Sequence, residues 1–388
     1  MNMLLSFSSF LSYLGYIVLA IVVLLFMVLI HELGHYTAGK MLKFKINEFS
    51  VGFGPKLLQK KRKNGELISL RAFPLGGYCA FEGENEENKA NPQAFNNQKP
   101  WKRLIVLFFG AFFNFLSGII FSFILLVSCG YDLIEVKNIE QTSINYNILQ
   151  TGDVLLGVDG KYVDFVDDVT FDVLITNKVK DNPDYSLDLN RDYNTFTIKD
   201  KNYNMQLHLI NFNIKRNGKK QEVTAKINIV YNDENKQYGW TVNSNYNDED
   251  SNEFVVGIHR YTFVEALTQA VPFACKWAWK ILIIFGKLLT GKLGISSLGG
   301  PVTTVKMMAS NTRANILNMV VLMPVIAINL AVFNLLPIPA LDGCQMVFVL
   351  IEMIRRKPIN PKVTNAINNI GLIVLLGFVL IVDLLQFI

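Results

Sequence analysis

Four long runs of apolar residues dominate the hydrophobic pattern of the chain. They are Leu11 to Ile30, Leu104 to Tyr131, Ala314 to Leu336 and Val363 to Val382. A helix of about 20 residues crosses the hydrocarbon core of a bilayer, and each run reaches that length. The apolar fraction of 51% and the aromatic fraction of 12% also fit a membrane protein that carries a soluble part. The pattern predicts a polytopic α-helical membrane protein with four transmembrane helices.

The loop between the first two runs, residues 44–100, has strand-like alternation. Ile68 to Ala72 alternates between apolar and polar residues, Pro74 to Tyr78 has the composition of a turn, and Cys79 to Phe81 is predicted to be a returning strand. These features predict a membrane-associated β-hairpin. Its edge could bind an extended peptide, or the hairpin could be a surface feature without a role, and the pattern leaves both open.

The stretch at 131–260 is polar and rich in Val, Ile, Thr, Tyr and Asn, which predicts a small mixed α/β domain. The next segment, Phe263 to Lys292, is apolar but interrupted by lysines. That pattern is typical of an amphipathic helix lying in the membrane interface. The predicted organisation is a first membrane half at 1–130, the soluble domain at 131–260, the interfacial helix and linker at 261–300, and a second membrane half at 301–388.

Charge is distributed unevenly along the chain. The loop at 44–100 and the segment Arg355 to Lys357 are basic, whereas 131–260 has more acidic than basic residues. Short basic loops mark the cytoplasmic side of a membrane protein, so we expect the 131–260 domain on the other side. Basic residues are not interleaved with aromatic ones, and no nucleic-acid partner is expected. Four scattered cysteines give no sign of a disulfide framework.

The first run ends in a motif with metal-binding spacing. A helix that continues through His31 and His35 places both imidazoles one turn apart on one face, where they can share a metal ion. Glu32 can reach a water on that ion, and this HExxH pattern is typical of zinc peptidases. Ionisable residues at membrane depth are costly and usually functional. The alternative is a polar cluster that caps the span at the lipid interface.

The third run ends in a second motif, Asn334-Leu-Leu-Pro337-Ile-Pro339-Ala-Leu-Asp342-Gly. The two prolines stop a regular helix, and irregular backbone at membrane depth is tolerated only where it faces protein or a wet cavity. A catalytic zinc usually has three protein ligands and a water, so Asp342 is the natural third ligand. By itself, Asp342 is better explained as a turn residue in Leu-Asp-Gly.

Together the two motifs resemble the site-2 protease family of intramembrane zinc metalloproteases, and the RseP-like bacterial branch is the nearer match. The supporting segments are similar to that family over nearly the whole chain. They are Gly52 to Lys56, Pro74 to Tyr78, Phe113 to Phe115, Leu149 to Gly160, which resembles a PDZ core, and Leu298 to Val302.

The resemblance implies a role for each matching residue. His31, His35 and Asp342 would bind Zn²⁺, Glu32 would be the general base, and Asn334 would lie near the substrate or the oxyanion. Substrate binding is assigned to Gly76, Gly77 and Asn114, although the sequence by itself favours a hydrogen bond between helices for Asn114. The sequence departs from the family at Cys344, where the family usually has a second glycine; we expect a small residue packed behind Asp342.

The resemblance further implies regulated intramembrane proteolysis in a bacterial plasma membrane. The substrates would be single-span membrane proteins already trimmed by another protease, such as anti-sigma factors and signal-peptide remnants. The active site would face the cytoplasm and the PDZ-like domain would lie outside it. The alternative is a catalytically inactive membrane scaffold or receptor that binds peptides through the PDZ-like domain.

Overall fold

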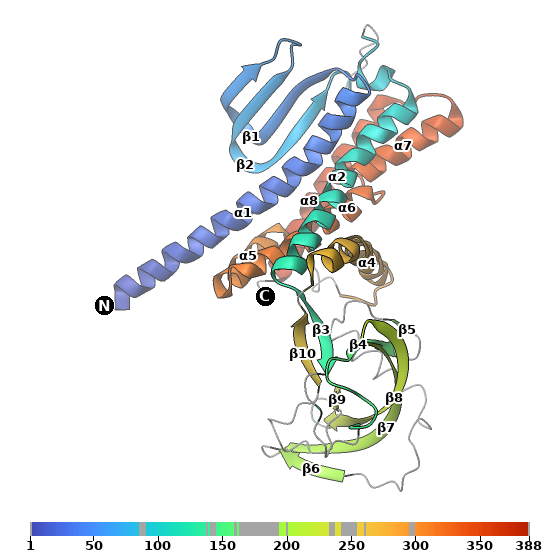
Figure 1. Cartoon of the computed structure of the whole chain (residues 1–388). Coiled ribbons are helices and arrows are strands. Elements are labelled where there is room, and N and C mark those ends of the chain that lie inside the picture. The colour runs from blue at the N-terminus through green and yellow to red at the C-terminus, as the bar shows by residue number, and fades with distance from the viewer. Residues whose placement is uncertain are drawn as a thin grey trace. The chain divides into compact units, whose positions relative to one another are not determined.

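The computed structural model describes residues 2–84, 91–136, 139, 145–158, 161–162, 194–198, 201–232, 237–241, 254–259, 261–294 and 299–386 (Figure 1). The chain divides into two compact units. The first combines Met1–Cys129 with Thr262–Ile388, and the second is Gly130–Tyr261.

Helices make up most of the first unit. They are α1 (Asn2–Met41), the short η1 (Phe95–Asn97), α2 (Pro100–Ser128), α4 (Phe263–Leu289), α5 (Pro301–Ala314), α6 (Leu317–Leu335), α7 (Asp342–Arg355) and α8 (Pro361–Leu385). Within the described residues, α1, α2, α6 and α8 are long and apolar enough to cross a membrane, which confirms the four predicted apolar helices. The helix α4 is not one of them, and its interfacial position stays a prediction.

Small residues bring the long helices close together. A Cβ atom on Gly34 of α1 would lie 2.2 Å from the Phe109 carbonyl oxygen of α2, and one on Gly118 of α2 would lie 2.6 Å from Ile328 of α6. Without a hydrophobic driving force inside lipid, helix association depends on such close packing. Ala274 of α4 packs in a buried apolar cluster with residues of α6. The N-terminus of α4 is stabilised by a capping box.

A two-element sheet lies beside α1 in Figure 1 and is built from β1 (Ile46–Lys61) and β2 (Leu67–Phe81). The predicted turn at Pro74 to Tyr78 lies where the chain reverses direction within β2: residues 67–70 run parallel to 48–51, whereas residues 77–80 run antiparallel to them. The two arms do not pair with each other as in a hairpin, because 48–51 lies between them. A further reversal lies at residues 62–66, where the Arg62 N–H donates to the Glu66 carbonyl at 2.8 Å.

The end of α8 holds the start of α5. The buried carboxylate of Asp383 accepts hydrogen bonds from the backbone N–H groups of Val302 and Thr303, at 3.2 and 3.0 Å, and from the Thr303 hydroxyl at 2.7 Å. A Cβ on Gly300 would lie 2.4 Å from that carboxylate carbon. Asp383 therefore supplies the cap that α5 lacks in its own sequence, and Gly300 makes room for it.

The second unit is an eight-stranded sheet of order β10-β3-β4-β7-β8-β9, with β5 on β4 and β6 on β7. The strands are β3 (Tyr131–Val136), β4 (Val154–Val158), β5 (Lys161–Tyr162), β6 (Asn194–Ile198), β7 (Lys201–Arg216), β8 (Lys219–Asn232), β9 (Gln237–Thr241) and β10 (Phe254–His259). Asp153, which is buried, forms an ion pair with the partly exposed Arg216 at 2.6 Å. Residues 163–193 lie outside the described residues, and the PDZ-like fold stays a prediction.

Candidate metal centre

Two histidines on α1 form the first part of the site. Because the helix continues past the apolar run to Met41, His31 and His35 fall on one face, with ring centroids 4.7 Å apart and planes at 87°. Their Nε2 atoms lie 3.1 Å apart. Both residues are 8% exposed, so the pair is shielded by protein.

Asp342, the first residue of α7, completes the cluster. Its Oδ2 atom lies 3.0 Å from His31 Nε2 and 3.4 Å from His35 Nε2. The three ligand atoms lie within 4.8 Å of one another, and Oδ2 is buried without a hydrogen-bond donor among the described residues. A metal cation satisfies three converging lone-pair atoms at once, and two imidazoles with one carboxylate are a typical zinc set. The residues present therefore fit Zn²⁺.

Irregular backbone carries Asp342 to this position. The helix α6 ends at Leu335, and Ala340 takes a left-handed conformation with φ 75° before α7 begins. Gly343 is confined, because a Cβ there would lie 2.2 Å from the Leu336 carbonyl oxygen. Two prolines prevent α6 from continuing, so the chain turns sharply enough to direct the Asp342 carboxylate at α1.

The site favours an ionised Asp342. Burial alone would raise the pKa of this carboxyl, but attraction to the adjacent His35 and His31 imidazoles outweighs it and holds the pKa below its usual range. A bound divalent cation acts in the same direction. Cys344 is buried, and burial raises the pKa of its thiol, as in a residue that only packs.

Partners on α2 orient the two imidazoles. His35 Nδ1 donates to the Val106 carbonyl at 2.8 Å, which leaves Nε2 as the ligand atom. Asn114 Nδ2 lies 3.4 Å from His31 Nδ1, while Asn114 Oδ1 is buried and has no hydrogen-bond partner in the described part of the chain. Exchanging the amide oxygen and nitrogen would let Oδ1 accept the His31 Nδ1 proton and free Nε2 for the metal. We therefore place Asn114 behind His31, and its predicted contact with substrate stays a prediction.

The strand β2 reaches the site beside Glu32. A backbone hydrogen bond links the Glu32 carboxylate to Cys79, and a Cβ on Gly77 would lie 3.7 Å from Glu32 Cγ. Gly76 is different, because a Cβ there would meet the Phe53 ring at 2.7 Å. The structure therefore brings Gly77 to the site, while Gly76 packs within the sheet.

Asn334 is half-buried on the last turn of α6. Its predicted role at the substrate stays a prediction.

The sequence interpretation missed Gly110. A Cβ on this α2 residue would lie 2.4 Å from His35 Nε2 and 2.7 Å from His31 Cε1, so only glycine leaves room for both rings. The signal was available, since Gly110 interrupts a run of large apolar side chains in the second span. The Val106 carbonyl carries no such signal, because a backbone acceptor is invisible in a sequence.

Comparison with known proteins agrees with this geometry. The model of peptidase family M50 matches residues 19–378, which include His31, His35 and Asp342. The chain belongs to this family. Since the family is the site-2 protease family and is zinc-dependent, the predicted resemblance and the predicted cofactor, Zn²⁺, are confirmed.

Several bacterial relatives share the whole length of this family member. A protein of Fusobacterium nucleatum is 29% identical over 375 residues, covering 94% of this chain and 96% of its own. One of Clostridium perfringens is 27% identical over 376 residues, covering 95% and 97%, and one of Helicobacter pylori is 26% identical over 369 residues, covering 93% and 96%. Their names assign all three provisionally as zinc metalloproteases.

Proposed function

We propose that this M50 family member is an intramembrane zinc endopeptidase that cleaves transmembrane segments of single-span membrane proteins. The convergence of His31 Nε2, His35 Nε2 and Asp342 Oδ2 on one point, with Glu32 one residue from the first histidine, carries the proposal. The family match and the four apolar helices support it.

The residues divide the chemistry between them. Zinc held by the three ligands would polarise the scissile carbonyl and lower the pKa of a bound water to about 7. Glu32 acts as the general base: its carboxylate takes a proton from the attacking water and delivers it to the leaving amide nitrogen. Asn334 is assigned to the substrate or the oxyanion that develops on the carbonyl.

The substrate must be extended where it is cut. A transmembrane helix hides its peptide bonds in its own hydrogen bonds, so it has to unwind before water can attack. Among the described residues, segment 77–81 of β2 is paired on one side only, with 46–51 of β1. We assign this edge to the unwound substrate, which would add to it as a strand next to Glu32.

The proposed setting is a bacterial plasma membrane, with the metal centre toward the cytoplasm and the 130–261 unit on the other side. The basic loop that contains β1 and β2 supports this orientation. The proposed partners are pre-trimmed single-span proteins such as anti-sigma factors and signal-peptide remnants, and the proposed role is regulated intramembrane proteolysis.

Cleavage of a purified single-span substrate tests the proposal. We expect cuts inside its membrane segment, mapped by mass spectrometry, that a chelator abolishes and added zinc restores. Substrates with helix-breaking residues should be cut faster than a polyleucine span. Bound zinc without cleavage of any of several single-span substrates would contradict the proposal and favour the inactive scaffold.

A further inference from the structure

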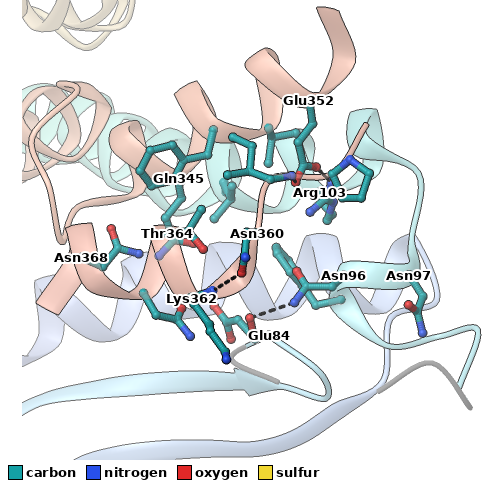
Figure 2. A pocket seen from close by; sticks show the side chains of 17 residues that line it. Glu84, Asn96, Asn97, Arg103, Gln345, Glu352, Asn360, Lys362, Thr364 and Asn368 are labelled. Atoms are coloured by element: carbon teal, nitrogen blue, oxygen red, sulfur yellow. Dashed lines mark hydrogen bonds and ion pairs between the residues drawn. The ribbon is translucent and has the colours of Figure 1, made fainter. Parts of the chain in front are cut away.

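A polar cavity of about 600 Å³ adjoins the metal centre in the helical unit. It is lined by the first two turns of α2 and α8, by one face of α7, by Glu84 and by the segment Phe95–Asn97 (Figure 2). Its volume is in the range of ligand-binding pockets. Its lining combines side chains from segments far apart in the sequence, so it exists only in the folded unit.

The cavity is next to the catalytic residues. On α7, Gln345 and Val349 line it and follow Asp342 at helical spacing, so one face of α7 carries both the metal ligand and the cavity wall. On α2, the lining residue Leu107 follows Val106, whose carbonyl binds His35. The helices α2 and α7 therefore hold both the metal centre and the wall of this cavity.

The lining is rich in carboxamides. They belong to Asn96, Asn97, Gln345, Asn360, Asn365 and Asn368. Each carboxamide both donates and accepts, as a peptide group does.

Four charged residues line the cavity: Arg103 and Lys362 are basic, and Glu84 and Glu352 are acidic. The guanidinium of Arg103, 7% exposed, pairs with Glu352, which also accepts the Ile359 N–H at 3.0 Å. Burial raises the pKa of Glu84 to about 7, so this carboxyl carries only part of a charge at neutral pH, and Lys362 is exposed. The buried charge of Arg103 is thus already paired, which suits a polar, uncharged chain.

Two lining atoms have unused hydrogen-bonding capacity. Arg103 Nε is a buried donor and Asn368 Oδ1 a buried acceptor, and neither has a partner among the described residues. Buried polar atoms are nearly always paired in folded proteins. Peptide backbone, with its alternating carbonyl and N–H groups, offers the complement to each.

We propose that this cavity binds the extended backbone of the substrate segment that flanks the scissile bond on the side of the membrane where α2 and α8 begin. The inference rests on the proposed peptidase function and adds a subsite to it. The cavity holds this flank by backbone hydrogen bonds, so it selects a flexible polar flank rather than a particular sequence.

Neighbouring asparagines on α8 provide a matched pair of variants. Asn368 lines the cavity, whereas Asn369 is exposed and is not part of the lining. Two substrates share one membrane segment, and one of them lacks the polar flank. We expect Asn368→Leu to raise KM about three- to tenfold for the flanked substrate and less for the truncated one, since one hydrogen bond is lost. Asn369→Leu should change neither. Equal effects on both substrates, or none, would overturn the subsite.

Crosslinking separates the subsite from the peptidase function. A photoreactive residue is placed at Asn365 or, as control, at Asn369 in a Glu32→Gln background, and zinc content is measured in the same preparation. We expect crosslinks from position 365 to the polar flank and none from position 369. If the wild type cleaves and holds zinc but position 365 gives no crosslink, the subsite is wrong and the peptidase stands. If the wild type neither binds zinc nor cleaves, both fail.

Discussion

The metal centre is assembled from two halves that are built in opposite ways. His31 and His35 come from the interior of α1, where regular helix geometry alone brings their rings together. Asp342 comes from the point where regular structure stops, after the end of α6 and a left-handed residue at Ala340. The first half depends on a repeat, and the second depends on one particular local conformation.

This difference predicts which changes each half tolerates. A helix distributes its stability over many hydrogen bonds, so a small side chain added on its open surface leaves the spacing of the two histidines intact. The break between α6 and α7 tolerates less, because a Cβ on Gly343 would clash with the carbonyl oxygens of Leu335 and Leu336. Changes of equal size should therefore have unequal effects on the two halves.

Removing a ligand from either half should have the largest effect. We expect His31→Ala and Asp342→Ala to lose bound zinc and all detectable cleavage, because a two-ligand site cannot hold the ion in competition with water. Metal analysis of the purified variants beside wild type measures this. A full equivalent of zinc in either variant would show that its half is not part of the centre.

The same added methyl group should affect cleavage very differently at the break before α7 and on the helix α1. Gly343→Ala must shift the start of α7, and a misplacement of about 1 Å costs on the order of 100-fold in rate. The control is Gly15→Ala on α1, where a Cβ would meet nothing within 4 Å, and which should leave cleavage unchanged. Cleavage rates and zinc content of the two variants test the prediction. Equal rates for both would remove the distinction between the halves.

Loss of Asn114, the residue beside His31 Nδ1, should weaken zinc binding less than loss of a ligand does. We expect Asn114→Leu to reduce zinc affinity about 10- to 100-fold, because His31 loses the group that fixes its ring and tautomer. Ser117→Ala is the control: it removes a hydrogen bond to the Asn114 carbonyl on the same helix, at 2.8 Å, without touching a histidine. Titration with a competing chelator gives both affinities, and identical values would exclude the positioning role.

The contact that ties α1 to the sheet should give the smallest effect. Glu66 is fully buried; burial would raise its pKa, but hydrogen bonds from Lys40 and Asn64 outweigh it and lower the pKa. Such a carboxylate stabilises the fold above its unfolded pKa of about 4.3, and the contribution disappears as pH falls through the lower folded value. We expect Glu66→Gln to lower Tm by about 2–4 °C at pH 7. The difference in Tm between wild type and variant should disappear at acidic pH.

Thermal unfolding of both proteins in detergent, at pH 7 and below pH 4, measures this difference in Tm. If the difference were the same at both pH values, Glu66 would stabilise the fold through packing and not through its charge.

Helical features were predictable because they depend on local periodicity. The apolar runs gave the four long helices, and the spacing of His31 and His35 gave the geometry of their half of the site. Asp342 could be predicted as a ligand only from the two motifs together and the family resemblance. Helical periodicity does not predict where a residue lies once the helix has ended. The position of the Asp342 carboxylate near α1 depends on the close packing of Gly343 against the Leu335 and Leu336 carbonyls, and a sequence does not reveal such packing.

The sheet shows how much a turn signal reveals. Pro74 to Gly77 has the composition of a turn, and the chain does reverse there, but the residues before and after it flank 48–51 instead of pairing with each other. A second reversal uses Asn64-Gly65, with Gly65 at φ 87°, and Asn-Gly is a strong hairpin signal that the sequence interpretation left out. Asn217-Gly218 between β7 and β8 carries the same signal, with φ 49° and 78°.

The most direct test of the central claim compares wild type with Glu32→Gln, measuring bound zinc and cleavage of a single-span substrate in the same samples. We expect about one zinc in both proteins and a loss of cleavage of at least about 100-fold in the variant, because the ligands remain and only the base is removed. Absence of zinc from wild type, or equal cleavage by both proteins, would contradict it.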